Sequence, residues 1–196
     1  MSKSADNGQP MVSSAKYIAL DVESCGLDIS KSLLSVYLVI LDENLNPIDE
    51  LDLLTKPNDG VYHLTAEALG VNGINIVEHD KVAITADYAG TKIYDFLNKN
   101  NPNGKVKLIP VGHNVTFDIE FVCAHTLAKK SWSKFCGYRC LDTGTISQFL
   151  IARGELPQMS ASLGTIAAHF GIEFAAHTAK GDTLATVAVL KKMLNK

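Results

Sequence analysis

No stretch of the sequence is apolar for long enough to cross a bilayer. The longest candidate, residues 33–41, is interrupted by Ser35 and falls far short of the roughly 20 apolar residues that a membrane-spanning helix needs. Residues 1–14 also lack a basic segment followed by an apolar one, so we expect no secretory signal. These absences predict a cytoplasmic protein that does not associate with membranes.

Cysteine is scarce, with only four residues in the chain: Cys25, Cys123, Cys136 and Cys140. Without a secretory signal they are expected to be reduced thiols. Cys136 and Cys140 lie close together with His125 upstream, which leaves a zinc-stabilised interaction module as an alternative. No second Cys or His pair has the spacing of zinc ligands, so small buried side chains are the favoured interpretation.

The length and composition suit a single globular domain. The chain has 196 residues, of which 46% are hydrophobic, and its mean hydropathy is +0.09. A domain of this size buries roughly 70% of its unfolded surface, so it needs no disulfides to hold a core. We expect a flexible tail over residues 1–14 and one domain over residues 15–196.

Charge is unevenly distributed although the net charge is only −3. Residues 1–100 contain 7 basic and 15 acidic side chains, a net charge of −8, whereas residues 101–196 contain 11 and 6, a net charge of +5. A protein that binds polyanions need not be basic overall if one face is. Taken alone, this asymmetry is more simply accidental.

Hydrophobic periodicity and turn signals predict an α/β domain with a mixed sheet. Three strands joined by short turns are expected to form an antiparallel meander, and Asn114 is expected to cap the helix that follows it. The expected strands are 17–23, 33–41, 47–56 and 106–111, and the expected helices are 65–69, 87–98, the segment after residue 114, 143–152, 160–170 and a last helix that carries Asp182 in its first turn.

Two acidic residues stand together at the end of the first expected strand. Side chains alternate across a strand, so Asp21 and Glu23 point to the same face. Asp21 follows the apolar run of residues 18–20, and a carboxylate that deep needs a partner. A lone Asp-x-Glu is a weak signal, but this setting favours a metal site.

Two further carboxylates and a histidine occupy the expected helices. Helical spacing places Asp118 beside core positions of the helix after residue 114, and Asp182 begins the apolar stripe of the last helix. His177 precedes Asp182 by five residues. Together with Asp21 and Glu23, these side chains would supply the oxygen ligands of two divalent cations and a base for a water nucleophile.

In order and context, the three patches resemble the DEDDh group of 3′–5′ exonucleases, the DnaQ-like family with the RNase H-like fold. Residues 21–23 (Asp-Val-Glu), followed by Gly26, are similar to the first motif of the family. Residues 113–118 (His-Asn-Val-Thr-Phe-Asp) are similar to the second, and residues 177–182 (His-Thr-Ala-Lys-Gly-Asp) to the third. The resemblance covers about residues 16–194.

The resemblance implies a two-metal mechanism with Mg²⁺ or Mn²⁺. Asp21 would bridge the two cations, Glu23 and Asp182 would complete one site, and Asp118 would support the other. His177 would act as general base and take a proton from the attacking water. The expected reaction releases nucleoside monophosphates from a 3′ end, with single-stranded DNA as the favoured substrate over RNA.

The resemblance also implies contacts with the substrate. Leu27 and Phe117 are candidates for stacking on the terminal nucleotide, and Lys180 is a candidate for contacting phosphates. Asn72 stands where the family often has a histidine, and Asn114 is a further candidate. Weaker phosphate candidates are Lys129, Lys130 and Arg139.

Other functions remain open alongside a DNA exonuclease. One is an RNA-trimming enzyme similar to RNase T or oligoribonuclease, because recognition of the 2′-hydroxyl depends on a few local contacts. Another is a non-catalytic nucleic-acid-binding scaffold, which five intact site residues disfavour. The chain ends 14 residues after Asp182, without the tail by which the epsilon proofreading subunit binds its polymerase, so a free-standing enzyme is expected. The sequence predicts no oligomeric state.

Overall fold

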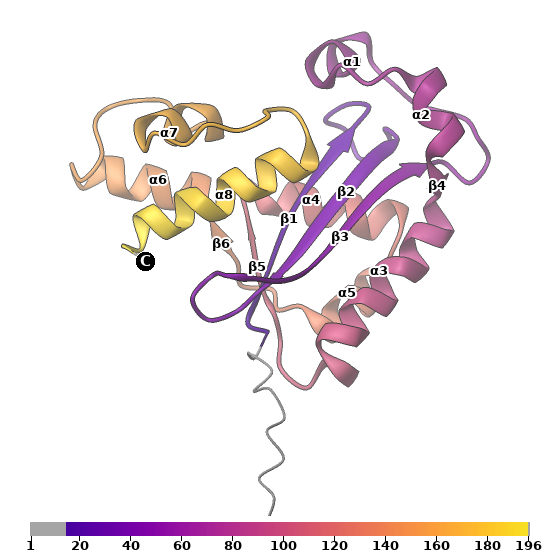
Figure 1. The fold of residues 1–196 in the computed structure, drawn as a ribbon. Helices are drawn as coiled ribbons and strands as arrows, with labels where there is room; N and C mark the ends of the chain where they lie inside the picture. Colours follow the sequence, from indigo (N-terminus) through magenta and orange to yellow (C-terminus); the bar gives the residue numbers. More distant parts are fainter. Residues whose placement is uncertain (1–14, 196) are drawn as a thin grey trace, which may run out of the picture.

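A six-stranded mixed sheet lies at the centre of the computed structural model, which describes residues 15–195 (Figure 1). The strands are β1 (Tyr17–Ser24), β2 (Leu33–Leu41), β3 (Pro47–Lys56), β4 (Ile84–Thr85), β5 (Ile109–Gly112) and β6 (Leu141–Asp142), in the order β4-β3-β2-β1-β5-β6. The first three strands form an antiparallel meander, and β5 and β6 continue the sheet parallel to β1. This confirms the expected α/β class. The tail expected over residues 1–14 lies outside the described residues.

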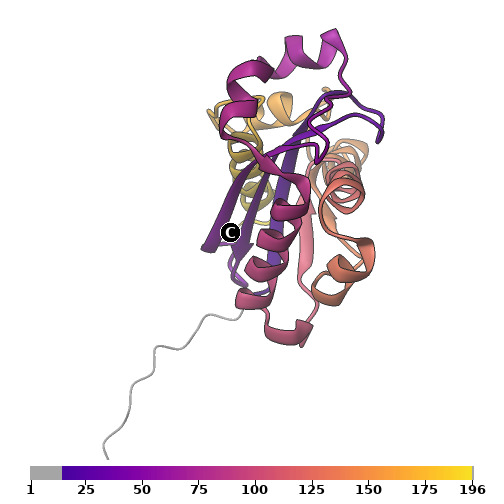
Figure 2. The ribbon, with the colours of Figure 1, turned by 90° about the vertical axis from the view of Figure 1, so that its right-hand side faces the viewer.

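Helices cover both faces of the sheet (Figure 2). They are α1 (Ala66–Asn72), α2 (Ile76–Val82), α3 (Ala86–Asn100), α4 (Val115–His125), α5 (Lys129–Phe135), α6 (Thr143–Ala152), α7 (Leu163–His169) and α8 (Ala179–Met193). The α3, α4 and α5 helices pack on one face, and α8 crosses β1, β2 and β5 on the other. None of the helices in the described range has the length and apolar character needed to cross a membrane.

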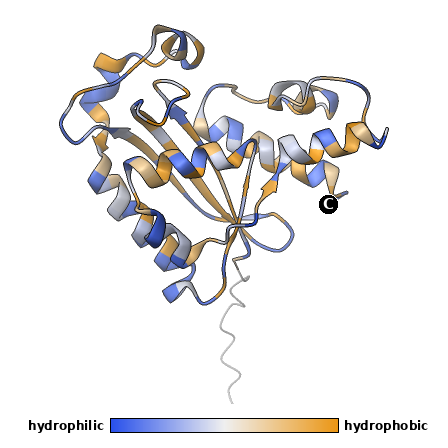
Figure 3. Cartoon of the chain, turned by 180° about the vertical axis from the view of Figure 1, so that it is seen from behind, coloured by the Kyte–Doolittle hydropathy of each residue, from blue (hydrophilic) through white to orange (hydrophobic). Residues whose placement is uncertain are grey.

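The alternation of β1 divides its side chains between the two cores. Ile18, Leu20 and Val22 pack with α3 and α4, whereas Tyr17 and Ala19 pack with α8. The central strands are mostly hydrophobic, whereas the helices carry both hydrophilic and hydrophobic residues (Figure 3). Because side chains on one face recur at every second residue, the row on the α8 side continues beyond Ala19 into the two acidic residues that end the strand.

The fourth strand is shorter than expected, which corrects the range of 106–111. It begins at Ile109 and pairs with β1 only along the first three residues of that strand, Tyr17 to Ala19. Val106 is largely exposed and lies outside the ladder, and Leu108 reaches only Cys136 through an isolated bridge. The apolar side chain of Val106 predicted a strand at this position, but the pairing of β5 with β1 begins only at Ile109. The short pairing leaves the rest of that edge of β1 without a neighbouring strand.

Asp142, and not Asn114, caps the helix that follows β5. Asn114 has a left-handed backbone with φ of 62° and makes no side-chain bond to the helix, so the expected Asn114 cap is wrong. Instead, Asp142 Oδ2 accepts a hydrogen bond of 2.8 Å from the backbone N–H of Val115, and its Oδ1 accepts one of 2.8 Å from Thr145. One carboxylate thus holds the first turns of α4 and α6, because helix N-termini carry unpaired donors and a partial positive charge.

The expected helix boundaries differ from the structure at several ends. The helix expected over 160–170 spans Leu163–His169. The last helix begins at Ala179 and carries Asp182 in its first turn, as expected. Two short helices, α2 and α5, and the two-residue strands β4 and β6 were not expected. These elements are too short for hydrophobic periodicity to reveal them.

Replacing Asp142 by alanine is predicted to lower the free energy of unfolding by about 2 kcal/mol. Each lost cap costs about 1 kcal/mol, and here one side chain caps two helices. Urea denaturation measures the change. Asp142→Asn keeps one acceptor oxygen and should lose about half as much, while Asp95→Ala, at an exposed site on α3, is the control. Equal stability of Asp142→Ala and the wild type would contradict the double cap.

Candidate active site

Three carboxylates from two distant segments meet on the α8 side of the sheet. Asp21 and Glu23 come from the end of β1, and Asp182 comes from the first turn of α8, whose N-terminal end lies near the tip of β1 (Figure 1). A carboxylate oxygen from each of the three lies within 4.8 Å of the others. The topology therefore joins two of the motifs that the sequence separates by more than 150 residues.

Local bonds at the start of α8 fix the direction of Asp182. Thr178 caps the helix by accepting a 3.1 Å bond from the backbone N–H of Gly181. A Cβ at Gly181 would clash with the carbonyl oxygen of Ala175, so only glycine permits this close turn. His177 has φ of 62° and donates its backbone N–H to Asp182 Oδ2 at 3.2 Å.

The fourth carboxylate reaches the strand from α4. Asp118 is buried, and its Oδ1 accepts a 3.1 Å bond from the backbone N–H of Val22. That donor is available because β5 pairs with β1 only as far as Ala19. The side chain of Asp118 thus bonds β1 where a neighbouring strand would otherwise pair with it. The bonded residue, Val22, lies between Asp21 and Glu23 in the sequence.

Burial and mutual repulsion disfavour ionisation of these carboxyls. Burial, and then the charges of Asp118, Asp182 and Glu23, raise the pKa of Asp21 well above its usual value. Burial, followed by the charge of Asp182, raises the pKa of Glu23 to about 7. The pKa values of Asp118 and Asp182 are also raised, chiefly by burial, against the backbone bonds that each accepts. Without a cation, these carboxyls therefore hold their protons more tightly than carboxyls in water do.

These residues fit divalent cations by the chemistry of their donors. Every donor is a carboxylate oxygen, the ligand that Mg²⁺ and Mn²⁺ prefer. Among the described residues, the side chains of Asp21 and Glu23 have neither a hydrogen-bond partner nor an ion pair. Buried carboxylates without partners are costly, and cations between them would remove that cost.

His177 lies beside the cluster on the segment that leads into α8. Its side chain is exposed, and its imidazole is close enough to help lower the pKa of Asp182 against the effect of burial. The expected role as general base remains a prediction. The position does give the ring access both to solvent and to the carboxylates.

A largely apolar cavity of about 510 Å³ adjoins Glu23. Leu27, Asn72 and Phe117 all line it, and Leu27 is 89% exposed. The side-chain amide of Asn72 donates to the backbone oxygen of Ser24 at 3.2 Å, so Asn72 ties α1 to the end of β1. Three of the expected substrate contacts therefore share one cavity next to the acids, and their roles stay predictions.

The other expected substrate contacts lie elsewhere. The ammonium of Lys180 pairs with Glu50 on β3 at 2.8 Å, so a phosphate would have to displace that carboxylate. Asn114 lines a separate polar hollow of about 390 Å³ with His113 and residues of α6. Lys129 lines a third cavity. The structure brings none of these three side chains into the acid cluster.

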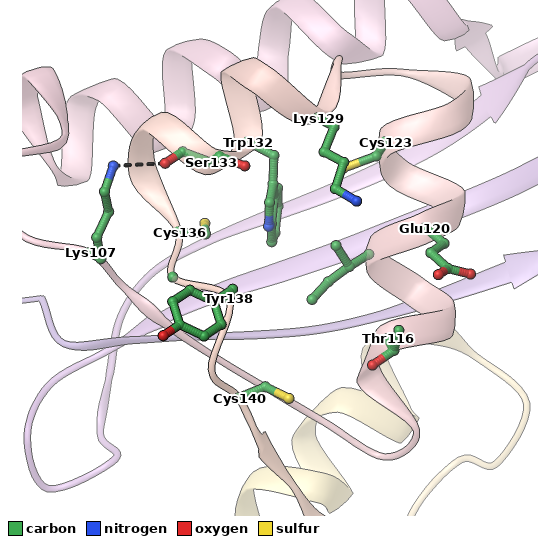
Figure 4. A pocket seen from close by; sticks show the side chains of 12 residues that line it. Lys107, Thr116, Glu120, Cys123, Lys129, Trp132, Ser133, Cys136, Tyr138 and Cys140 are labelled. Atoms are coloured by element: carbon green, nitrogen blue, oxygen red, sulfur yellow. Dashed lines mark hydrogen bonds between the residues drawn. The ribbon is translucent and has the colours of Figure 1, made fainter.

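That third cavity, of about 460 Å³, lies between α4 and α5 and contains three of the cysteines (Figure 4). Cys123, Cys136 and Cys140 line it, but burial raises the pKa of all three thiols. Within the described part of the chain, the only group of three side chains that suits a metal is the acid cluster. The zinc alternative therefore gains no support from the structure.

Two residues that organise the site carried little signal in the sequence. No local motif marks Asp142 as part of the site, although its position just before a helix is typical of an N-cap. Its bond to Val115 spans 27 residues, which no local pattern predicts. Glu50 lies among other acidic residues of β3, a pattern typical of a solvent-facing strand, yet it contacts Lys180 in the first turn of α8.

Comparisons with known proteins agree with this geometry. A family model described as exonuclease matches residues 18–190. No curated protein matches the chain in sequence. Solved structures of exonuclease I are similar in fold. One, whose description concerns processivity, is 21% identical with a TM-score of 0.74, and the match covers 91% of this chain and 41% of that one.

Two further structures are of the E. coli enzyme. The complex with a dT13 oligonucleotide is 21% identical, with a TM-score of 0.74 and coverage of 91% and 41%. The zinc-bound complex with single-stranded DNA is 20% identical, with a TM-score of 0.75 and coverage of 93% and 41%. The chain thus spans about two fifths of the length of exonuclease I. Because the family model covers most of the sequence, the chain belongs to the exonuclease family, in its DnaQ-like DEDD group, with the RNase H-like fold.

Proposed function

We propose that the chain is a metal-dependent 3′–5′ exonuclease that releases nucleoside monophosphates, with single-stranded DNA as its substrate. The observation that carries the proposal is the meeting of Asp21, Glu23 and Asp182 within 4.8 Å, with Asp118 bonded to the same strand. The structural neighbours described with DNA oligonucleotides support the choice of substrate. We further propose that residues 15–196 act as one exonuclease domain in the cytoplasm.

The four acids would hold the metal. Asp21, Glu23 and Asp182 would be the principal ligands of divalent cations, with Asp118 completing the set. When bound, Mg²⁺ or Mn²⁺ ions would activate the attacking water and offset the charge of the scissile phosphate. Without them the cluster would repel a phosphate backbone, so nucleic acid should bind weakly in the presence of a chelator.

The remaining residues would orient the substrate and move the proton. His177 would accept a proton from the attacking water, since a base needs to be within hydrogen-bond reach of the proton it takes. The cavity beside Glu23 would receive the terminal nucleoside, with Phe117 and Leu27 against its base. A cavity that accepts a terminal nucleoside favours cleavage at an end of the strand.

A time course on 5′-labelled single-stranded DNA and RNA of matched sequence tests the proposal. With Mg²⁺ or Mn²⁺, we expect a ladder that shortens from the 3′ end, faster on DNA and absent in EDTA. Asp182→Asn should lower the rate at least about 10- to 100-fold, because it replaces an anionic ligand by a neutral amide. Asp95→Asn makes the same change on an exposed part of α3 and should cleave normally.

Three results would count against this function. A faster reaction on RNA would favour the RNA-trimming alternative. Cleavage by Asp182→Asn at the rate of the wild type would remove the site assignment. No cleavage of either nucleic acid by folded protein with metal present would favour a binding scaffold.

His177→Ala is predicted to lower kcat about 10²- to 10⁴-fold, as expected for loss of a general base, while metal binding persists. Single-turnover cleavage measures the rate, and the metal-induced rise in Tm measures binding. His169→Ala removes an exposed imidazole from α7 and serves as the control. Unchanged turnover in His177→Ala would point to a different base.

Metal affinity is predicted to rise with pH up to about 7 and then to level off. The raised pKa of Glu23 means that a cation must displace its proton below about pH 7, which costs roughly tenfold in affinity per pH unit. The folded, metal-free protein also binds this proton more tightly than the unfolded chain, so its stability should fall as the pH rises from about 4.5 to about 7.

Calorimetric titration of Mn²⁺ between pH 5.5 and 8.5 measures this dependence. Glu23→Gln, which has no proton to displace, should bind more weakly and with a flatter pH profile. A wild-type affinity that is independent of pH over this range would contradict the raised pKa.

A further inference from the structure

Glu50 on β3 joins two side chains that border the active site. Its Oε2 accepts a hydrogen bond from the hydroxyl of Tyr37, and its Oε1 accepts one of 2.8 Å from the ammonium of Lys180. That ammonium also lies 5.2 Å from the centre of the Tyr37 ring. The three side chains therefore form a closed set of contacts, in which each touches the other two.

The sheet register connects this set to the acid cluster. Tyr37 is directly opposite Asp21 on the neighbouring strand and is fully buried on the α8 side of the sheet. Asp52, on β3, is opposite Tyr37 in turn, and Glu50 lies two residues further along the same face. Helix α8 packs over β1 and β2. The side chains of Glu50 and Asp52, on β3, remain largely accessible to solvent.

Lys180 carries this connection into the turn that bears the catalytic candidates. It is two residues before Asp182 and three after His177, in the first turn of α8. The other hydrogen bonds of this turn are local: Thr178 to Gly181, and His177 to Asp182. The bond from Lys180 to Glu50 spans 130 residues and fixes the turn to a different strand of the sheet.

We propose that Glu50 is a positioning residue of the active site: through Lys180 it holds the first turn of α8 against the sheet, so that Asp182 faces Asp21 and Glu23. The proposal rests on the proposed function for its effect on cleavage, but the positioning of the turn can be measured without it. Tyr37 contributes by fixing one oxygen of Glu50, which leaves the other directed at Lys180.

The contact is weak in energy and matters through geometry. An ion pair that is about half exposed on both sides stabilises little, so Glu50 is not expected to be needed for folding. Displacements of about 1 Å at a catalytic group nevertheless lower rates by up to about 100-fold. A metal ligand held by a weak contact is therefore sensitive to its loss even where overall stability is not.

The variants are Glu50→Gln, Lys180→Met and the double variant, compared with Asp52→Asn. Asp52 is the matched control, because it is exposed, carries the same charge and lies two residues away on the same face. Replacing Asp52 by asparagine changes the electrostatic field at the site, including at Lys180, without removing a hydrogen bond to α8. Any effect of Glu50→Gln that Asp52→Asn also produces is therefore a general effect of charge.

Three readouts separate positioning from other roles. We expect kcat at saturating metal to fall about three- to tenfold in each single variant, with KM for the oligonucleotide changed less than about twofold. The double variant should be no slower than the slower single variant, because both substitutions break the same contact. Amide hydrogen exchange over residues 177–183 should accelerate about three- to tenfold in Glu50→Gln and Lys180→Met, and not in Asp52→Asn.

Each outcome bears on a different claim. Unchanged exchange over residues 177–183 in both single variants, or additive losses in the double variant, would overturn the proposal. A rise in KM with unchanged kcat would also overturn it and would assign Lys180 to phosphate binding. If the wild type cleaves no nucleic acid, the proposed function fails, while the exchange measurement still decides whether Glu50 holds the turn.

Discussion

Repulsion among carboxylates is the constraint that the rest of the structure must accommodate. Asp21, Glu23 and Asp182 hold oxygens within 4.8 Å of one another, and no lysine or arginine in residues 15–195 forms an ion pair with them. The protein keeps them together through backbone contacts, which do not neutralise charge: the N–H of Val22 bonds Asp118, and that of His177 bonds Asp182. Such a cluster lowers stability, as charged groups gathered at functional sites generally do.

Two features of the fold place Asp118 against β1: the short β5 strand and the bond from the start of α4 to Asp142. The short pairing of β5 leaves an edge of β1 free for the side chain of Asp118. Asp142 then fixes the first turn of α4, and with it the position of Asp118, by bonding the N–H of Val115. A longer β5 would pair with the edge of β1 that Asp118 contacts. The short length of β5 is therefore needed for this contact.

The sequence predicted those parts of the structure that depend on local patterns. The ranges expected for β2 and β3 agree with the structure because each strand is bounded by turn residues and filled by β-prone ones. Helix and strand periodicity placed Asp118 and Asp182 beside core positions and put Asp21 and Glu23 on one face, and the family resemblance then joined them as three motifs. The cap of α4 and the partner of Lys180 depend on contacts across 27 and 130 residues, which no local pattern contains.

We propose that the acid cluster binds divalent metal. Diffraction from crystals soaked in Mn²⁺ tests this binding directly. Anomalous scattering locates manganese independently of activity and of the choice between DNA and RNA. The account predicts anomalous peaks in contact with the carboxylates of Asp21, Glu23 and Asp182, which disappear in Asp21→Asn crystals treated in the same way. Well-ordered carboxylates without manganese at saturating concentration, or manganese bound only elsewhere, would contradict it.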